Sequence, residues 1–183
     1  MLDFVITKAI NEFGRSTFID SLSQVISANA FVTLLISLVV LIIIFKEKKN
    51  AAKIFLIILA AIILHFLFTD FIIKGFIANQ GFERTRPYLA YPNEISPIGN
   101  LSTDSSFPSG HVSIIVAFLF IPCYFYRKKF VWILSGILVV LMALSRLHNG
   151  MHYPSDVLFG ALFGKAYGFI AIKAIEYYKR KKK

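Results

Sequence analysis

Five long apolar runs divide this chain, and each is close to the length that a helix needs to cross a bilayer. They cover residues 28–45, 53–73, 110–126, 130–147 and 157–177. The runs are continuous rather than alternating, which favours helices over strands. Only 16% of the residues are charged, whereas a soluble domain averages about a quarter. We therefore expect one all-α, membrane-embedded domain over residues 1–183, folded as a polytopic transmembrane bundle with five spans.

The first 26 residues differ in kind from the runs that follow. Apolar residues recur at helical spacing between Leu2 and Phe13, with acids and a lysine between them. This pattern predicts an amphipathic helix that lies in the membrane interface and ends at Gly14. The alternative is a short sixth span, against which Asp3 and Glu12 argue because acids are costly in hydrocarbon.

Basic residues are concentrated at the ends of the apolar runs. The clusters lie at 46–53, 127–129 and 179–183 and supply much of the net charge of +10. Such clusters set orientation and contact anionic membrane lipids, whereas a nucleic-acid footprint would be a basic face on a soluble domain. We therefore expect no nucleic-acid partner. The clusters are predicted to be cytoplasmic, and segments 74–109 and 148–156 are predicted to lie on the outer side.

The outer segments hold three polar clusters. In the middle one, Ser109 and Gly110 precede His111 just where the third run begins. A helix that starts here offers free backbone N–H groups to an anion. A histidine at that position is suited to donate a proton or to activate water. The alternative is an ordinary helix cap with a surface histidine.

The first and the third polar clusters add cations, a second histidine and an acid. If the chain is helical after residue 152, His152 and Asp156 share one face, and the carboxylate can hold one imidazole nitrogen while the other attacks. Arg146 ends the fourth run, where a cation is costly without a partner. Lys74 and Arg86 follow the second run, and an arginine forks readily onto phosphate oxygens.

Together the three clusters resemble the type 2 phosphatidic acid phosphatase superfamily. Its pattern is Lys-x6-Arg-Pro, then Pro-Ser-Gly-His, then Ser-Arg-x5-His-x3-Asp. The second element is complete at 108–111 and the third at 145–156. The first element departs, because eleven residues separate Lys74 from Arg86 and Asn79 holds the position that strict spacing gives to lysine. Either Lys74 fills the role across a longer turn, which we favour because it ends the second run, or that role is weakened.

The resemblance, which covers about residues 50–175, implies a role for each matching residue. His152 would attack phosphorus and form a phosphohistidine, and Asp156 would orient it. His111 would protonate the leaving group and then activate water. The expected phosphate contacts are Lys74, Arg86, Arg146, Ser109 and Gly110, with Arg84 and His148 as further candidate contacts. No metal or cofactor is expected. His65 lies outside the motifs, and we interpret it as a histidine satisfied within the bundle.

The function implied by the resemblance is that of an integral membrane lipid phosphatase acting at the extracytoplasmic face, in a bacterial inner membrane. Its substrate would be a lipid phosphomonoester or diphosphate, such as undecaprenyl diphosphate, lipid A 1-phosphate, phosphatidylglycerol phosphate or phosphatidic acid. The alternatives are a lipid phosphotransferase with the same site and an anion or lipid carrier. A carrier does not explain two histidines with a supporting acid, and the runs show no repeated halves. The sequence makes no prediction of oligomeric state.

Overall fold

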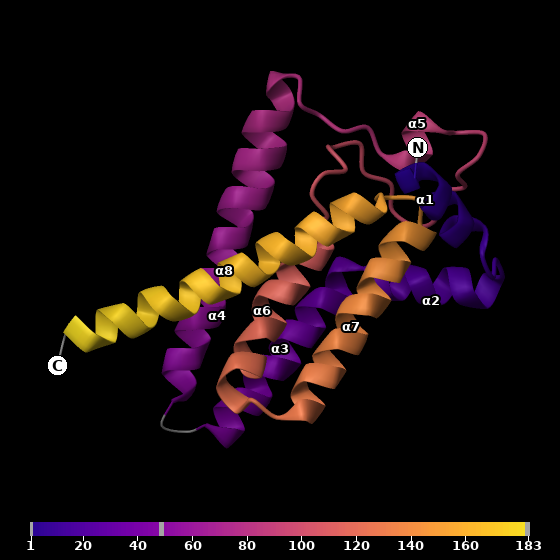
Figure 1. The fold of residues 1–183 in the computed structure, drawn as a ribbon. Helices are drawn as coiled ribbons and strands as arrows, with labels where there is room; N and C mark the ends of the chain where they lie inside the picture. The colour runs from indigo at the N-terminus through magenta and orange to yellow at the C-terminus, as the bar shows by residue number, and fades with distance from the viewer. Residues whose placement is uncertain (1, 48–49, 182–183) are drawn as a thin grey trace.

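The computed structural model describes residues 2–47 and 50–181, and the elements within these ranges are all helical (Figure 1). The predicted all-α class is therefore confirmed. The elements are α1 (Leu2–Glu12), α2 (Thr17–Ser27), α3 (Asn29–Lys46), α4 (Ala51–His65), the π-helix η1 (Phe66–Ile77), the 3₁₀ turn η2 (Ala78–Gln80), α5 (Pro87–Ala90), α6 (Gly110–Tyr126), α7 (Lys129–His148) and α8 (Pro154–Lys181). Lys48, Lys49, Lys182 and Lys183 of the predicted basic clusters lie outside the described residues.

The predicted apolar runs each fall on a helix. Four described helices are long and apolar enough to cross a membrane: α3, the continuous helix Ala51–Gln80, α7, and α8 as far as Tyr178. The helix α6 is apolar but shorter, at 17 residues. The helix ends that flank the basic loops 46–53 and 127–129 lie at the opposite end of the bundle from the loop 81–109 (Figure 1). The count of five spans stays a prediction.

The N-terminal region forms two helices: α1, where the sequence predicted an amphipathic helix, and α2 after it. Gly14 lies between them with a φ of +66°, a left-handed backbone that glycine adopts at little cost. The Ser16 side chain accepts a hydrogen bond from the backbone N–H of Ile19 and so caps α2. The helix α2 packs against α7 before the chain enters α3.

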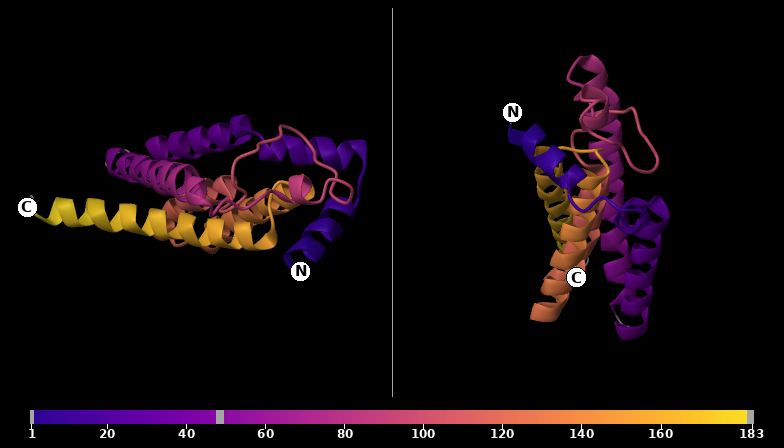
Figure 2. Two further views of the ribbon diagram at one scale, coloured as in Figure 1. Left: turned by 90° about the horizontal axis from the view of Figure 1, so that it is seen from above. Right: turned by 90° about the vertical axis from the view of Figure 1, so that its right-hand side faces the viewer.

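The helix α6 lies at the centre of the bundle, between α4, α7 and α8 (Figures 1 and 2). It packs most extensively against α8, which crosses it obliquely. A Cβ atom on Gly160 or Gly168 would lie only 2.6 or 2.8 Å from the carbonyl oxygens of Ser109 and Ala117, and one on Gly164 would collide with that of Ser113. The glycines of α8 therefore allow close backbone contact, which is the usual effect of small residues at four-residue spacing between membrane helices.

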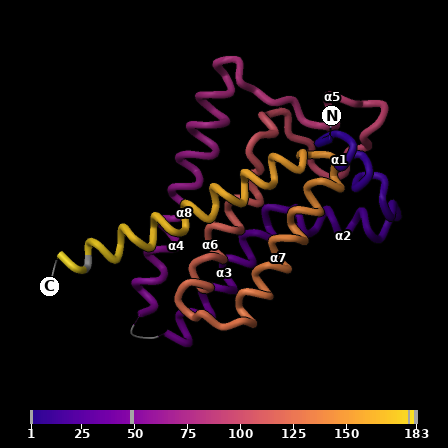
Figure 3. The backbone as a smooth tube through the Cα atoms, in the orientation of Figure 1, coloured from indigo at the N-terminus to yellow at the C-terminus, as the bar shows by residue number. Residues whose placement is uncertain are grey.

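This close contact also fixes where α6 begins. The backbone N–H of Ser109 donates to the carbonyl oxygen of Asp156, in the first turn of α8, over 3.0 Å. The long segment between η2 and α6, which contains α5, winds over the same end of the bundle beside α1 (Figure 3). The start of α6, the start of α8 and this segment therefore meet in one place.

Candidate active site

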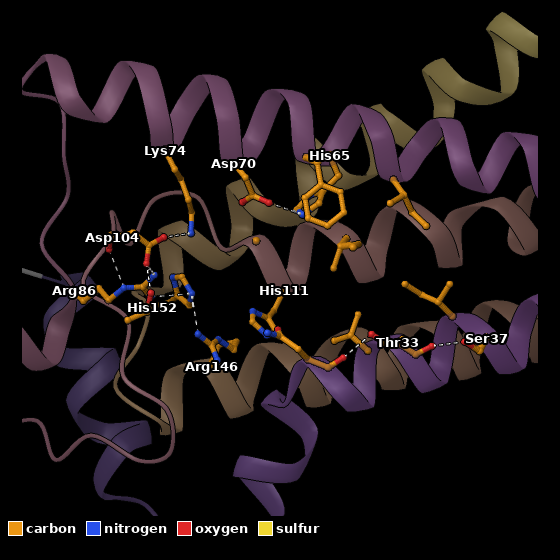
Figure 4. A pocket seen from close by; sticks show the side chains of 18 residues that line it. Thr33, Ser37, His65, Asp70, Lys74, Arg86, Asp104, His111, Arg146 and His152 are labelled. Carbon is orange, nitrogen blue, oxygen red and sulfur yellow. Dashed lines mark hydrogen bonds and ion pairs between the residues drawn. The ribbon is translucent and has the colours of Figure 1, made fainter.

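A cavity of about 580 Å³ opens at that end of the bundle, between α3, η1 and the start of α6. All three polar clusters contribute to its wall (Figure 4). The lining residues that the sequence singled out are Lys74, Arg86, Gly110, His111, Arg146 and His152. Both histidines thus face the same space, although 40 residues of sequence lie between them.

The beginning of α6 presents an uncapped helix N-terminus beside the cavity. Ser109 is its N-cap residue, but its side chain makes no capping hydrogen bond. The Ser109 hydroxyl is buried and has no partner within the described chain. The first N–H groups of α6 therefore remain available to an anion, which the positive end of the helix also favours.

The π-helix η1 explains how Lys74 reaches the cavity. An α-helix advances about 100° per residue, so Lys74, nine residues after His65, would point about 180° away from it. The i→i+5 hydrogen bonds of a π-helix place more residues in each turn. In this winding His65, Asp70 and Lys74 all line the cavity. The lysine of the stretched first motif therefore lies on the α4–η1 wall and reaches toward the start of α6, with its Nζ 4.0 Å from where a Gly110 side chain would begin.

His152 is held with its Nε2 nitrogen toward the cations. Its Nδ1 lies 2.8 Å from the carbonyl oxygen of Ser106, and because a carbonyl only accepts, Nδ1 carries the proton. Nε2 lies 3.4 Å from Nη1 of Arg86 and 3.5 Å from Nη2 of Arg146. Burial lowers the pKa of His152 well below its usual range, and the two arginines act in the same direction. The ring is therefore neutral near pH 7, with a lone pair on Nε2.

Asp156 stands behind this histidine without bonding to it. Its Oδ2 lies 3.8 Å from Nδ1 of His152 and accepts the backbone N–H of Tyr153 at 2.8 Å. Its Oδ1 accepts from Nη1 of Arg84 at 2.6 Å. We expected the carboxylate to hold the imidazole, but the Ser106 carbonyl is the nearer acceptor. Asp156 therefore lies beside His152 as a charged neighbour and closes the backbone turn at Tyr153.

Two further candidate contacts are placed away from the cavity. The Arg84 guanidinium bonds to Asp3 of α1 at 2.7 Å and to Asp156, and it stacks on the Tyr153 ring at 4.1 Å. Burial alone would lower the pKa of Arg84, but the hydrogen bond with Asp3 and the charge of Asp156 raise it. The imidazole of His148 bonds to the α1 backbone and to Asp20 of α2. Neither residue lines the cavity.

Asp104 is a cavity residue that the sequence reasoning missed. Its carboxylate bridges the cations, 3.0 Å from Nζ of Lys74 and 2.7 Å from Nη2 of Arg86. Burial would raise the pKa of Asp104, but the Ser102 hydroxyl and then these cations hold it well below its usual range. The only signal in the sequence is an acid shortly before the Pro-Ser-Gly-His element.

Other buried groups around the cavity lack partners within the described chain. Nε2 of His111 and Nε of Arg146 make no hydrogen bond. A buried donor left unsatisfied costs about 1–3 kcal/mol, so such atoms mark a place built for a ligand. Three cations and an open helix N-terminus make that ligand an anion. No group of three or more His, Cys, Asp or Glu side chains among residues 2–47 and 50–181 is placed to hold a metal.

Comparison with known protein families identifies the superfamily of this chain. Residues 50–180 match the family model of the PAP2 superfamily, and the chain belongs to that superfamily. An undecaprenyl-diphosphatase from Sulfolobus acidocaldarius is 32% identical over 105 residues, which are 56% of this chain and 48% of that protein. This chain thus spans about half the length of the curated relatives that it matches.

Two crystal structures share the fold. A transmembrane PAP2-type phosphatidylglycerolphosphate phosphatase from Bacillus subtilis covers all of this chain, with a TM-score of 0.67 and 22% identity, and 86% of that chain is matched. The match to LpxE from Aquifex aeolicus covers 94% of this chain and 96% of LpxE, with a TM-score of 0.71 and 19% identity. At these identities the likeness concerns the fold.

Proposed function

We propose that this chain is a membrane lipid phosphatase that removes phosphate from a lipid through a phosphohistidine on His152. One observation carries the proposal. Three cations, an unprotonated imidazole nitrogen and the unpartnered Nε2 of a second histidine all face one buried cavity. Phosphoryl transfer depends mainly on positioning and charge stabilisation, and this wall supplies both.

In the proposed reaction each of these residues has a step. The phosphate oxygens are bound by Arg86, Arg146 and the first N–H groups of α6. Lys74 also binds them, either while it keeps its ion pair with Asp104 or after that ion pair opens. Nε2 of His152 then attacks phosphorus and forms an N–P bond as the bond to the leaving oxygen breaks. His111 gives that oxygen its proton. In the second step His111 takes a proton from water, which attacks the phosphohistidine and releases inorganic phosphate. The cations supply the charge stabilisation, so we propose a reaction without metal or cofactor.

The rest of the cavity suits a lipid. Away from the cations its wall is mainly apolar and is formed by α3, α4, η1 and α6, through Val32, Ile36, Ile62, Phe66 and Ile114, with the hydroxyl groups of Thr33 and Ser37 among them. This side runs along helices that are suited to span a membrane. Candidate substrates are the lipids named from the sequence. We place the site on the extracytoplasmic side of a bacterial inner membrane, with the basic loops cytoplasmic.

The test is phosphate release from a panel of purified lipid phosphates by the full chain in detergent. We expect release with at least one lipid, at a rate unchanged by strong chelation. His152→Ala should reduce turnover by about 10³-fold or more while the protein still elutes as a folded species. Substrate labelled in its phosphate should leave acid-labile label on the wild type and none on His152→Ala. Near-normal turnover by His152→Ala would refute the nucleophile, and rescue of chelated enzyme by Mg²⁺ would refute metal independence.

A further inference from the structure

His65 and Asp70 form a polar pair in the cavity that the proposed reaction leaves without a role. Only 3% of His65 is exposed, and its Nδ1 lies 3.1 Å from the Ser113 hydroxyl of α6. Its Nε2 faces Oδ2 of Asp70 at 3.5 Å. Figure 4 shows both side chains on the α4–η1 wall, across the cavity from His111 and beyond Lys74 as seen from His152.

The position of this pair matters because of where a leaving group must lie. The atom displaced from phosphorus lies roughly opposite the attacking nitrogen, here Nε2 of His152. That direction leads into the cavity, toward His111. The part of the substrate attached to the leaving oxygen therefore lies between His111 and the His65–Asp70 pair. In a phosphomonoester this is an uncharged lipid alcohol, whereas in a lipid diphosphate it is the second phosphate.

The charges on the cavity wall distinguish the two cases. The cations Arg86 and Arg146 lie at the His152 end. Lys74 is the cation nearest the pair, and it is already bonded to Asp104. The pair itself carries a charge of minus one, or of zero when His65 is protonated. The Asp70 Oδ1 atom also lies close to the start of α6, 3.7 Å from where a Gly110 side chain would begin.

We propose that Asp70, supported by His65, disfavours a second phosphate, so that the site selects lipids with one terminal phosphate over lipid diphosphates. This rests on the proposed function, because it takes the transferred phosphate to lie at His152. A second phosphate would bring more negative charge against the Asp70 carboxylate, and these like charges repel even though the side chain is 42% exposed and solvent weakens the repulsion. Selectivity then arises from a repulsive group as well as from attractive ones.

The experiment uses two substrates that differ by one phosphate. The purified full chain is given dioleoylglycerol phosphate or dioleoylglycerol diphosphate in the same detergent micelles, and initial rates are followed by chromatography of the lipid products. We expect kcat/KM for the monophosphate to exceed that for the diphosphate by about tenfold or more. Asp70→Asn should lower this ratio by about tenfold, through a gain on the diphosphate, with the monophosphate rate within about twofold of wild type.

Two variants control for other causes. Glu83→Gln removes the same charge from an exposed position in the loop 81–109 and should leave the ratio within about twofold. His65→Gln removes the imidazole that faces Asp70 but keeps the Asp70 charge, so the ratio should stay within about twofold of that of the wild type. The proposal is overturned if the wild type prefers the diphosphate, or if Asp70→Asn remains active on the monophosphate with an unchanged ratio. Release from neither lipid, nor from any of the panel, would instead overturn the proposed function itself.

Discussion

The two sides of His152 are built differently. On the cavity side, Nε of Arg146 and Nε2 of His111 are buried and have no partner within the described chain. On the far side, both carboxylate oxygens of Asp156 accept hydrogen bonds, and Arg84 joins Asp156 to Asp3. A buried group without a partner lowers stability, whereas a paired one fixes its neighbours. The cavity side is thus arranged for a ligand, and the far side holds the histidine in place.

The largest contrast is expected between the two arginines. Arg146→Gln removes a buried cation whose Nε has no partner within the described chain, so kcat/KM for a lipid phosphate should fall by about 10²–10³-fold with little loss of thermal stability. Arg84→Gln leaves Asp3 and Asp156 without their cation. It should lower the free energy of unfolding by about 1–2 kcal/mol, since Arg84 is partly exposed, and reduce activity by less than Arg146→Gln. Melting curves and kinetics on both variants measure this, and equal effects on stability would remove the contrast.

A second pair tests the cation of the stretched motif. Lys74 lines the cavity, whereas Asn79, at the motif's strict spacing, is exposed in η2. Lys74→Ala should reduce kcat/KM by about 10²-fold, and Asn79→Ala should stay within about twofold. The reverse order of effects would show that the motif is aligned wrongly.

The contact that joins α6 to α8 gives a third pair. A methyl group on Gly164 would collide with the Ser113 carbonyl, whereas one on Gly136 of α7 meets nothing within 4 Å. Gly164→Ala should cost about 1–3 kcal/mol of stability by overpacking and shift His111 relative to His152. Gly136→Ala should be neutral or stabilise by up to about 1 kcal/mol. Thermal midpoints in detergent report both, and a harmless Gly164→Ala would contradict the close packing.

The smallest expected effect is the pH dependence of stability. Burial lowers the pKa of His152 in the folded chain, while the unfolded value is about 6.5. As pH falls below about 6.5, the unfolded chain takes up a proton that the folded chain does not, so stability declines by at most ~1.4 kcal/mol per pH unit from this group. The thermal midpoint should fall less between about pH 7.5 and about pH 5.5 in His152→Gln than in the wild type. Identical slopes would contradict the lowered pKa.

Much of the architecture could be predicted, because apolar runs, basic clusters and glycine spacing are properties of the side chains themselves. The sequence also indicated which residues would share a site, and Lys74, Arg86, His111, Arg146 and His152 do line one cavity. It could not reveal that the acceptor for His152 is the backbone of Ser106, since a carbonyl is the same in every residue. It ranked Arg84 below Arg86 but did not predict that Arg84 turns toward Asp3 and Asp156, because direction at that scale depends on a loop whose path is set by tertiary contacts.

The π-winding of η1 bears on how relatives of this chain are to be found. A helix that takes up additional residues within its turns can lengthen the sequence between two functional side chains while both still face the same space. Searches that count positions between a lysine and an arginine would discard such proteins. An alignment that compares which helix face each residue occupies, and that permits π-helical turns, would retain these proteins. It would also indicate where insertions are tolerated.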